Sequence, residues 1–257
     1  MDVIIFSGQS NMQGQTERLT ESLAVSDAYE YKWLTDEAVP LRNPVGENIT
    51  YALTEGEPVT YRTDIPAWLK AHALGASCYG NTNLVPAFCR TYGEGTGRSV
   101  LAVHGAKGST VIADWLPGTP IYDVLVRKVR GALAKVDSDR IFFVWLQGES
   151  DALCSVTREK YKASLRTLCG GLKADLGIDR FGIIRVGRFA KDGRDDEIIG
   201  AQEEICEEDP DFIMLTRLAA ELNEKPEFMN PSVGGHYSAA GLELLGAEAA
   251  KTLCQLL

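Results

Sequence analysis

The sequence is poor in histidine, and its cysteines form no pattern that suggests a metal site or a redox motif. Among 257 residues there are three histidines and six cysteines, and no two cysteines form a Cys-x-x-Cys pair. Because a structural zinc ion needs clustered sulfur and nitrogen ligands, such a site is not expected. We interpret the cysteines as reduced thiols, which are typical of cytoplasmic proteins.

Long apolar runs and an excess of basic residues are also missing. No stretch is long enough to span a bilayer, and the residues after Met1 lead into an apolar segment without a basic leader. The formal net charge is −10, from 26 basic and 36 acidic residues. Because an acidic chain repels nucleic acid and anionic membranes, neither is expected as a partner. We expect a cytoplasmic protein with a neutral substrate, unless a local Arg or Lys matches an acidic one.

Length and composition fit one large α/β domain. Hydrophobic residues make up 45% of the chain and charged residues 24%, so a sizeable core can form. No internal repeat, low-complexity run or linker divides the sequence. Residues 1–257 are therefore expected to form a single domain.

Apolar runs alternate with amphipathic segments along most of the chain. Continuous apolar runs predict strands at Ile4–Phe6, Ser99–His104, Arg140–Leu146, Phe181–Val186 and Asp211–Leu215. Helical spacing predicts helices from Leu84 onward and at Ile121–Val136, Arg158–Leu176, Asp195–Glu208 and Ser238–Leu253. Such alternation is typical of a parallel sheet covered on both faces. The pattern predicts a three-layer α/β/α sandwich with a five-stranded parallel sheet.

Residues 16–76 lack this regular pattern and are predicted to form long loops, with a short hairpin around Val59–Tyr61. Loops of this length in a compact domain are usually functional. They could wall a pocket in which Trp33 or Trp68 stacks on a sugar. Alternatively, these aromatic side chains only hold the loops together.

Polar turns follow three of the predicted strands. They contain Ser10 after the first strand, residues 105–110 after the second and residues 147–151 after the third. Because the carboxyl ends of parallel strands meet at one edge of a sheet, these turns should lie together. His236 precedes the last predicted helix, and a serine and a histidine at one edge are typical of a nucleophile and its base. Taken alone, the serine turn would indicate only a polar turn.

Three segments together carry a resemblance to a known family. The chain contains, in this order, Gly8–Met12 (Gly-Gln-Ser-Asn-Met), Trp145–Asp151 (Trp-Leu-Gln-Gly-Glu-Ser-Asp) and His236–Gly241 (His-Tyr-Ser-Ala-Ala-Gly). The sequence thereby resembles the SGNH hydrolase superfamily, and more closely its sialate O-acetylesterase and acetylxylan esterase branch, carbohydrate esterase family six. The resemblance implies a flavodoxin-like fold and hydrolysis of acetyl esters on sugars without a metal or other cofactor.

The resemblance also implies roles for individual residues. Ser10 is the expected nucleophile and His236 the expected general base. The oxyanion hole would use the Ser10 backbone N–H and Gln147. Its third donor would be Gly80 or, because the spacing there is irregular, Asn83.

Substrate contacts are expected from polar residues near the nucleophile. Gln9 and Asn11 flank Ser10 with amide groups, and His104 ends the second predicted strand near the same edge. His104 could instead be a structural residue.

The chain departs from the family at the position that orients the histidine. Most relatives have an aspartate three residues before it, and this position is Val233 here. Because a wrongly oriented imidazole can lower turnover about 10⁴-fold, another group must hold His236. We expect Glu149 to do so, with a backbone carbonyl as the alternative. Glu149 could also only tie the Ser10 turn to its neighbour.

These features predict a cytoplasmic serine esterase that removes O-acetyl groups from a carbohydrate such as sialic acid or a xylan-type oligosaccharide. An acyl group would be carried on Ser10. One alternative is a carbohydrate-binding protein that has lost catalysis on the same fold, which the missing aspartate favours. Another is a thioesterase or lysophospholipase, which would need a long apolar groove beside Ser10.

Overall fold

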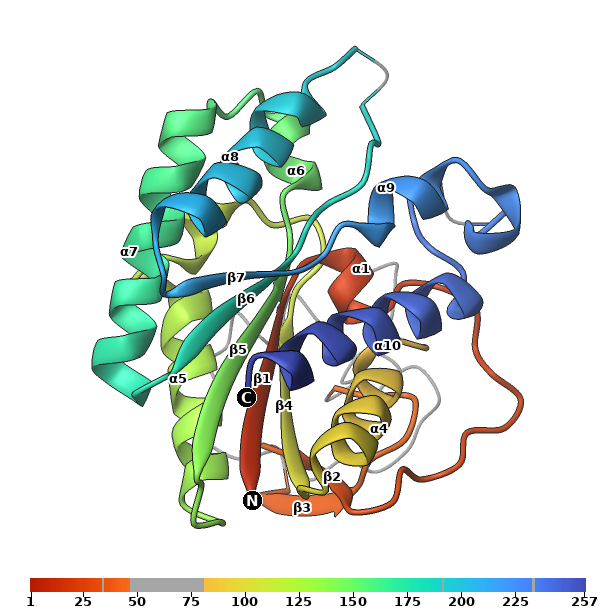
Figure 1. Cartoon of the computed structure of the whole chain (residues 1–257), viewed down its shortest axis with the longest axis vertical. Helices are drawn as coiled ribbons and strands as arrows, with labels where there is room; N and C mark the ends of the chain where they lie inside the picture. Colours follow the sequence, from red (N-terminus) through yellow and green to blue (C-terminus); the bar gives the residue numbers. More distant parts are fainter. Residues whose placement is uncertain (34, 47–80, 191, 233) are drawn as a thin grey trace.

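A seven-stranded sheet forms the centre of the molecule (Figure 1). The computed structural model describes residues 1–33, 35–46, 81–190, 192–232 and 234–257. The strands are β1 (Asp2–Gly8), β2 (Ala28–Lys32), β3 (Glu37–Pro40), β4 (Val100–Ala106), β5 (Arg140–Leu146), β6 (Arg180–Ile184) and β7 (Phe212–Thr216). Their order across the sheet is β3-β2-β4-β1-β5-β6-β7, and all neighbours are parallel except β2 and β3.

The helices cover both faces of the sheet. They are α1 (Ser10–Gln13), α4 (Val85–Thr96), α5 (Pro120–Leu133), α6 (Glu149–Leu153), α7 (Arg158–Leu176), α8 (Asp195–Glu208), α9 (Leu218–Asn223) and α10 (Ala239–Gln255), with 3-10 turns η1 (Ile112–Trp115) and η2 (Pro226–Phe228). Helices α4 and α10 pack together on one face, and α5, α7 and α8 lie on the other (Figure 1). Within the described ranges, no helix combines the length and the apolar character that a membrane crossing requires.

The predicted three-layer α/β/α sandwich is confirmed, but the number of strands is wrong. The five predicted strands correspond to β1, β4, β5, β6 and β7. Strands β2 and β3 lie in the segment that was predicted as loops. They are short, and β3 is mostly exposed at the edge of the sheet, so neither shows the continuous apolar run of a central strand.

Helix ends follow local capping signals. The Thr157 side chain accepts a hydrogen bond from the Lys160 N–H at the start of α7, and Gly177 ends this helix in the left-handed conformation. The Ser238 side chain likewise accepts from the Gly241 N–H at the start of α10. The predicted bounds of α7 and α8 are both confirmed, and for α7 they coincide with these local signals.

Strand β1 is the centre of the core. All seven of its residues are buried, and Val3–Phe6 are 0% exposed. A central parallel strand has helices over both faces, which explains why its apolar residues are consecutive. Its carboxyl end therefore presents the following turn at the middle of the sheet edge.

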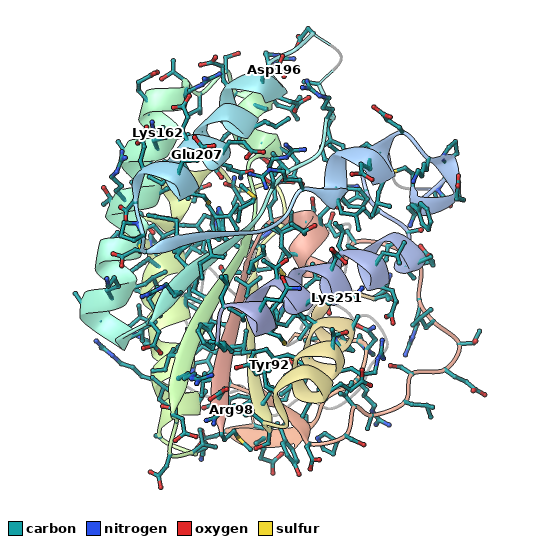
Figure 2. The ribbon with its side chains drawn as sticks, in the orientation of Figure 1. Tyr92, Arg98, Lys162, Asp196, Glu207 and Lys251 are labelled. Carbon is teal, nitrogen blue, oxygen red and sulfur yellow. The ribbon has the colours of Figure 1, made fainter. Side chains whose placement is uncertain are left out.

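Charged side chains lie on the outer faces of the helices (Figure 2). Lys162 of α7 pairs with Glu204 and Glu208 of α8, at 2.8 and 2.6 Å. At the other end of the molecule, Tyr92 and Arg98 donate hydrogen bonds to the buried carboxylate of Asp2. Ion pairs at the protein surface stabilise a fold little, whereas the buried Asp2 contacts fix the start of β1.

Candidate active site

Ser10 lies at the carboxyl end of β1, where it begins the short helix α1. Gly8, with φ +144°, makes the turn possible, because a Cβ at this position would lie 2.0 Å from the Leu146 carbonyl oxygen. Ser10 is buried, with 8% of its surface exposed. Its N–H lies in the first turn of α1, where no helical carbonyl can accept it. This N–H is therefore available to a ligand.

The three polar turns meet at one edge of the sheet, as predicted. The Lys107 N–H after β4 donates to the Gly8 carbonyl at 2.9 Å, and the Gln9 N–H donates to the Leu146 carbonyl at 3.0 Å. The Gly108 N–H donates to the Gln13 side chain of α1 at 2.8 Å. The turns after β4 and β5 therefore flank the Ser10 turn.

The histidine loop lies next to the Ser10 turn. Asn11 contacts both chain neighbours of His236: its Oδ1 accepts from the Tyr237 N–H at 3.2 Å, and its Nδ2 lies 3.5 Å from the Gly235 carbonyl. No hydrogen bond joins the Ser10 hydroxyl to the His236 imidazole among the described residues. Asn11, which follows Ser10 in the chain, therefore connects the serine turn to the histidine loop.

A backbone carbonyl holds the His236 ring. Its Nδ1 lies 2.9 Å from the Gly234 carbonyl oxygen. Because a carbonyl only accepts, Nδ1 carries the proton and Nε2 has the lone pair. Nε2 is buried and has no hydrogen-bond partner in the described part of the chain. This is the tautomer that a general base needs.

Among the described residues, the hydrogen bonds of Glu149 reach the histidine loop through Asn11. It is 6% exposed, and its Oε1 accepts a hydrogen bond from the Asn11 Nδ2 at 2.8 Å. Its Oε2 is buried without a partner among the described residues. Burial raises the pKa of this carboxyl above its ordinary value. The direct contact between Glu149 and His236 that we expected is not formed.

Gln147 is occupied in joining the three turns. It is 0% exposed, and its Nε2 lies within hydrogen-bond distance of Gln9, Thr110 and Asp151. Its Oε1 accepts from the Tyr161 hydroxyl at 2.9 Å. Three acceptors already share its two N–H groups. In this arrangement Gln147 offers no free donor to an oxyanion. Its hydrogen bonds instead hold the three turns together.

The expected substrate contacts are also used within the protein. Gln9 is 4% exposed, and its Oε1 faces the N–H groups of Gly148 and Ser150 at 3.4 and 3.2 Å. His104 is 5% exposed, and its Nε2 lies 3.0 Å from the Met12 carbonyl. Asn11 makes the contacts given above. These side chains fix the turns around Ser10.

Several residues predicted for the site or its walls lie outside the described residues. Two others lie near the site or in the core. Outside are Val59–Tyr61, Trp68, Gly80 and Val233. Asn83 is buried beside the end of α1, where a Cβ on Gly14 would lie 2.7 Å from the Asn83 Cβ. Trp33 is 2% exposed and belongs to the hydrophobic core, so it does not form a sugar-stacking surface.

Sequence reasoning gave no role to two residues that the structure places here. Asp151 is 0% exposed and accepts hydrogen bonds from the Ile112 N–H and from Gln147; burial raises its pKa to about 6. Lys107 is half-buried, and it has no acidic partner among the described residues. Burial lowers the pKa of Lys107. The sequence signals that could have indicated these residues were their positions: Asp151 ends the Trp145–Asp151 motif, and Lys107 directly follows β4, the strand next to β1.

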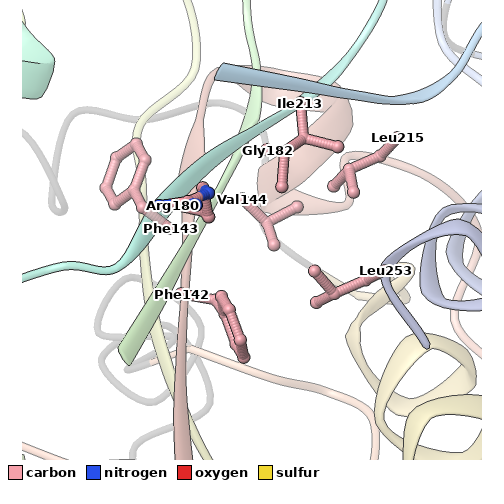
Figure 3. A pocket seen from close by; sticks show the side chains of 8 residues that line it. All are labelled: Phe142, Phe143, Val144, Arg180, Gly182, Ile213, Leu215 and Leu253. Carbon is pink, nitrogen blue, oxygen red and sulfur yellow. The ribbon is translucent and has the colours of Figure 1, made fainter. Parts of the chain in front are cut away.

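An apolar hollow lies away from these turns (Figure 3). Phe142 and Val144 of β5, Ile213 and Leu215 of β7 and Leu253 of α10 are among the residues that line it. It is part of the packing between the sheet and α10 and contains none of the predicted site residues. Within the described residues, no three His, Cys, Asp or Glu side chains gather as a metal site.

The sheet order and the serine turn at the end of β1 are those of an SGNH hydrolase fold. Residues 1–255 match the model of the family described as carbohydrate esterase, sialic acid-specific acetylesterase. The chain belongs to this family. It is a carboxylic ester hydrolase that acts on acetylated carbohydrates.

Solved structures support the fold. A protein from Arabidopsis thaliana is 17% identical, with a TM-score of 0.70 over 100% of this chain and 99% of that one. NanS is 14% identical, with a TM-score of 0.65 over 99% and 97% of the two chains. A catalytic mutant of Axe2, an acetylxylan esterase from Geobacillus stearothermophilus, is 12% identical, with a TM-score of 0.50 over 96% and 91%. No curated protein sequence matches this chain.

Proposed function

We propose that this esterase removes O-acetyl groups from sialic-acid-type sugars through an acyl-enzyme on Ser10. The observation that carries the proposal is the position of the two reacting groups. Ser10 follows β1, and the His236 loop is joined to the same turn by Asn11. The imidazole has its Nδ1 on the Gly234 carbonyl and its Nε2 unpaired in the described part.

The reaction has two halves. In the first, Nε2 of His236 removes the proton from the Ser10 hydroxyl while Oγ attacks the acetyl carbon. The tetrahedral intermediate collapses, the C–O bond to the sugar breaks, and the imidazolium gives its proton to the sugar oxygen. In the second, Nε2 of His236 removes a proton from water while the water oxygen attacks the acyl carbon. The bond between this carbon and Oγ then breaks, the imidazolium returns its proton to Oγ, and acetate leaves.

The developing oxyanion needs donors that are already in place. The Ser10 N–H is one, because α1 leaves it without an intrahelical acceptor. We propose the Asn83 amide as a second, since Asn83 lies beside the end of α1 and its Oδ1 already accepts from the Val85 N–H at 3.1 Å. Gly80 remains an alternative for this donor. Gln147 would act indirectly, by holding the turns in place.

Lys107 supports an acidic sugar over a neutral one. A sialic acid carries a carboxylate, which an ammonium group without a carboxylate partner can bind. Lys107 is half-buried on the turn that donates to the Gly8 carbonyl, and no acidic group in the described residues pairs with it. In a chain of net charge −10, a cation near the serine turn provides the local positive charge that an acidic substrate requires.

Hydrolysis of p-nitrophenyl acetate by the wild type and by Ser10→Ala tests the nucleophile. We expect a loss of at least about 10³-fold, and equal rates would contradict the proposal. O-acetylated sialic acid and acetylated xylo-oligosaccharides, compared in the wild type and in Lys107→Ala, test the substrate. Lys107→Ala should raise KM about tenfold for the sialic acid only. Turnover of a long-chain acyl thioester alone would favour the thioesterase alternative, and sugar binding without turnover would favour a binding protein.

A further inference from the structure

Asn11 joins the serine turn to the histidine loop. It directly follows Ser10 and is 2% exposed. Its Oδ1 accepts from the Tyr237 N–H at 3.2 Å, and its Nδ2 lies 3.5 Å from the Gly235 carbonyl. The chain on both sides of His236 is therefore held by the residue next to the nucleophile.

Glu149 determines how the Asn11 amide is turned. The Asn11 Nδ2 donates to the Glu149 Oε1 at 2.8 Å, and both side chains are buried. Because a carboxylate oxygen accepts, it selects the orientation with the nitrogen toward Glu149. The amide oxygen then faces the Tyr237 N–H. The opposite orientation would place an N–H group against the Tyr237 N–H.

The far side of the histidine loop is anchored independently. Tyr237 is 0% exposed, and its hydroxyl lies 3.0 Å from the Ala219 carbonyl and 3.1 Å from the Asn223 Oδ1. Its ring packs edge-on against Phe189, with 5.9 Å between the ring centroids. The Asn11 contacts therefore set the position of a loop whose following residue is already fixed in the core.

We propose that Asn11 is a positioning residue that holds His236 toward Ser10, and that Glu149 acts through Asn11 by fixing its amide. This inference rests on the proposed function. It replaces the expected substrate contact of Asn11, because both polar atoms of this side chain are bonded to the protein. A displaced imidazole slows proton transfer while the sugar still binds, so kcat should fall and KM should remain.

Exchanging the two side chains tests the proposal. Asn11→Asp sets a second carboxylate against Glu149 and should lower kcat for p-nitrophenyl acetate at least about tenfold, with KM changed less than about threefold. Adding Glu149→Gln restores a donor facing the new carboxylate. The kcat of the double variant should therefore be at least about threefold higher than that of Asn11→Asp. Gln15→Glu is the matched control, because it makes the same amide-to-acid change near α1 at a side chain whose described hydrogen bond goes to Gln13, 3.1 Å away, and not to the histidine loop.

Glu149→Gln alone decides the case if Asn11→Asp does not fold, which far-UV circular dichroism and urea unfolding will show. The glutamine oxygen can still accept from Asn11, so kcat should fall less than about tenfold. A larger loss would mean that the Glu149 carboxylate acts on His236 directly, which overturns the relay through Asn11.

Other results would also overturn the proposal that Asn11 positions His236. The proposal is overturned if Asn11→Asp changes kcat less than about tenfold, changes mainly KM, or is not improved by Glu149→Gln. These results are separate from a failure of the proposed function, which shows as unchanged activity in Ser10→Ala.

Discussion

Replacing Asp151 with asparagine should remove a large part of the pH dependence of folding stability. Asp151 is 0% exposed, and burial, its first cause, raises the pKa to about 6 from the ordinary value of 3.8. Between these pH values the folded protein holds a proton that the unfolded chain has lost. Stability from this group is therefore complete below about pH 4 and is lost as the pH rises through about 6.

The size of this effect follows from the two pKa values. At about 1.4 kcal/mol per pKa unit, the difference between 3.8 and about 6 corresponds to ~3 kcal/mol of unfolding free energy. Urea unfolding followed by tryptophan fluorescence, at several pH values from 4 to 7, measures it. The wild type should lose up to ~3 kcal/mol more than Asp151→Asn over this range.

The comparison needs a control, since burial also raises the pKa of Glu30, Glu149 and Asp195. Those groups remain in both proteins. Only the difference between the wild type and Asp151→Asn in the slope of unfolding free energy against pH is therefore assigned to Asp151. Asp137→Asn, at an exposed position, is matched for the change of side-chain charge. Equal slopes in the wild type and Asp151→Asn would refute the reasoning, because the carboxyl would then titrate alike in the folded and unfolded states.

Two further predictions concern the frame of the site. Gly8→Ala should lower Tm by at least about 4 °C, because the new Cβ would lie 2.0 Å from the Leu146 carbonyl oxygen; an unchanged Tm in differential scanning calorimetry would contradict this. Tyr161→Phe should lower the unfolding free energy by about 1–3 kcal/mol in urea titrations, since its hydroxyl ties the turn after β5 to α8. A loss below about 0.5 kcal/mol would show that this hydroxyl is replaceable.

The parts of the fold that depend on local signals could be predicted from sequence. The five core strands are continuous apolar runs, and α7 has a threonine cap and a terminal glycine, so pattern alone located them. Strand β3 was missed because it is a short, mostly exposed strand at the edge of the sheet, and β2 because the polar Glu30 and Lys32 alternate with its other residues, so that its five residues form no continuous apolar run. Short segments of this composition resemble loops.

The site was predicted as a set of residues, while their contacts were not. Gln147 and Asn11 each bond to partners more than 100 positions away, and these contacts depend on strand register and on side-chain direction. The motif brought Glu149 to the right edge of the sheet. The contact partner of Glu149 depends on where Asn11 and the histidine loop lie, and the sequence does not give these positions.

The edge strand β3 has a consequence for self-association. It has four residues, it includes Glu37 and Pro40, and it runs against the direction of the other strands. A proline has no N–H to offer a foreign strand, and a charge at the rim disfavours stacking of a second sheet. Within the described residues, the sheet therefore ends on this side with a strand whose composition disfavours the addition of a further strand.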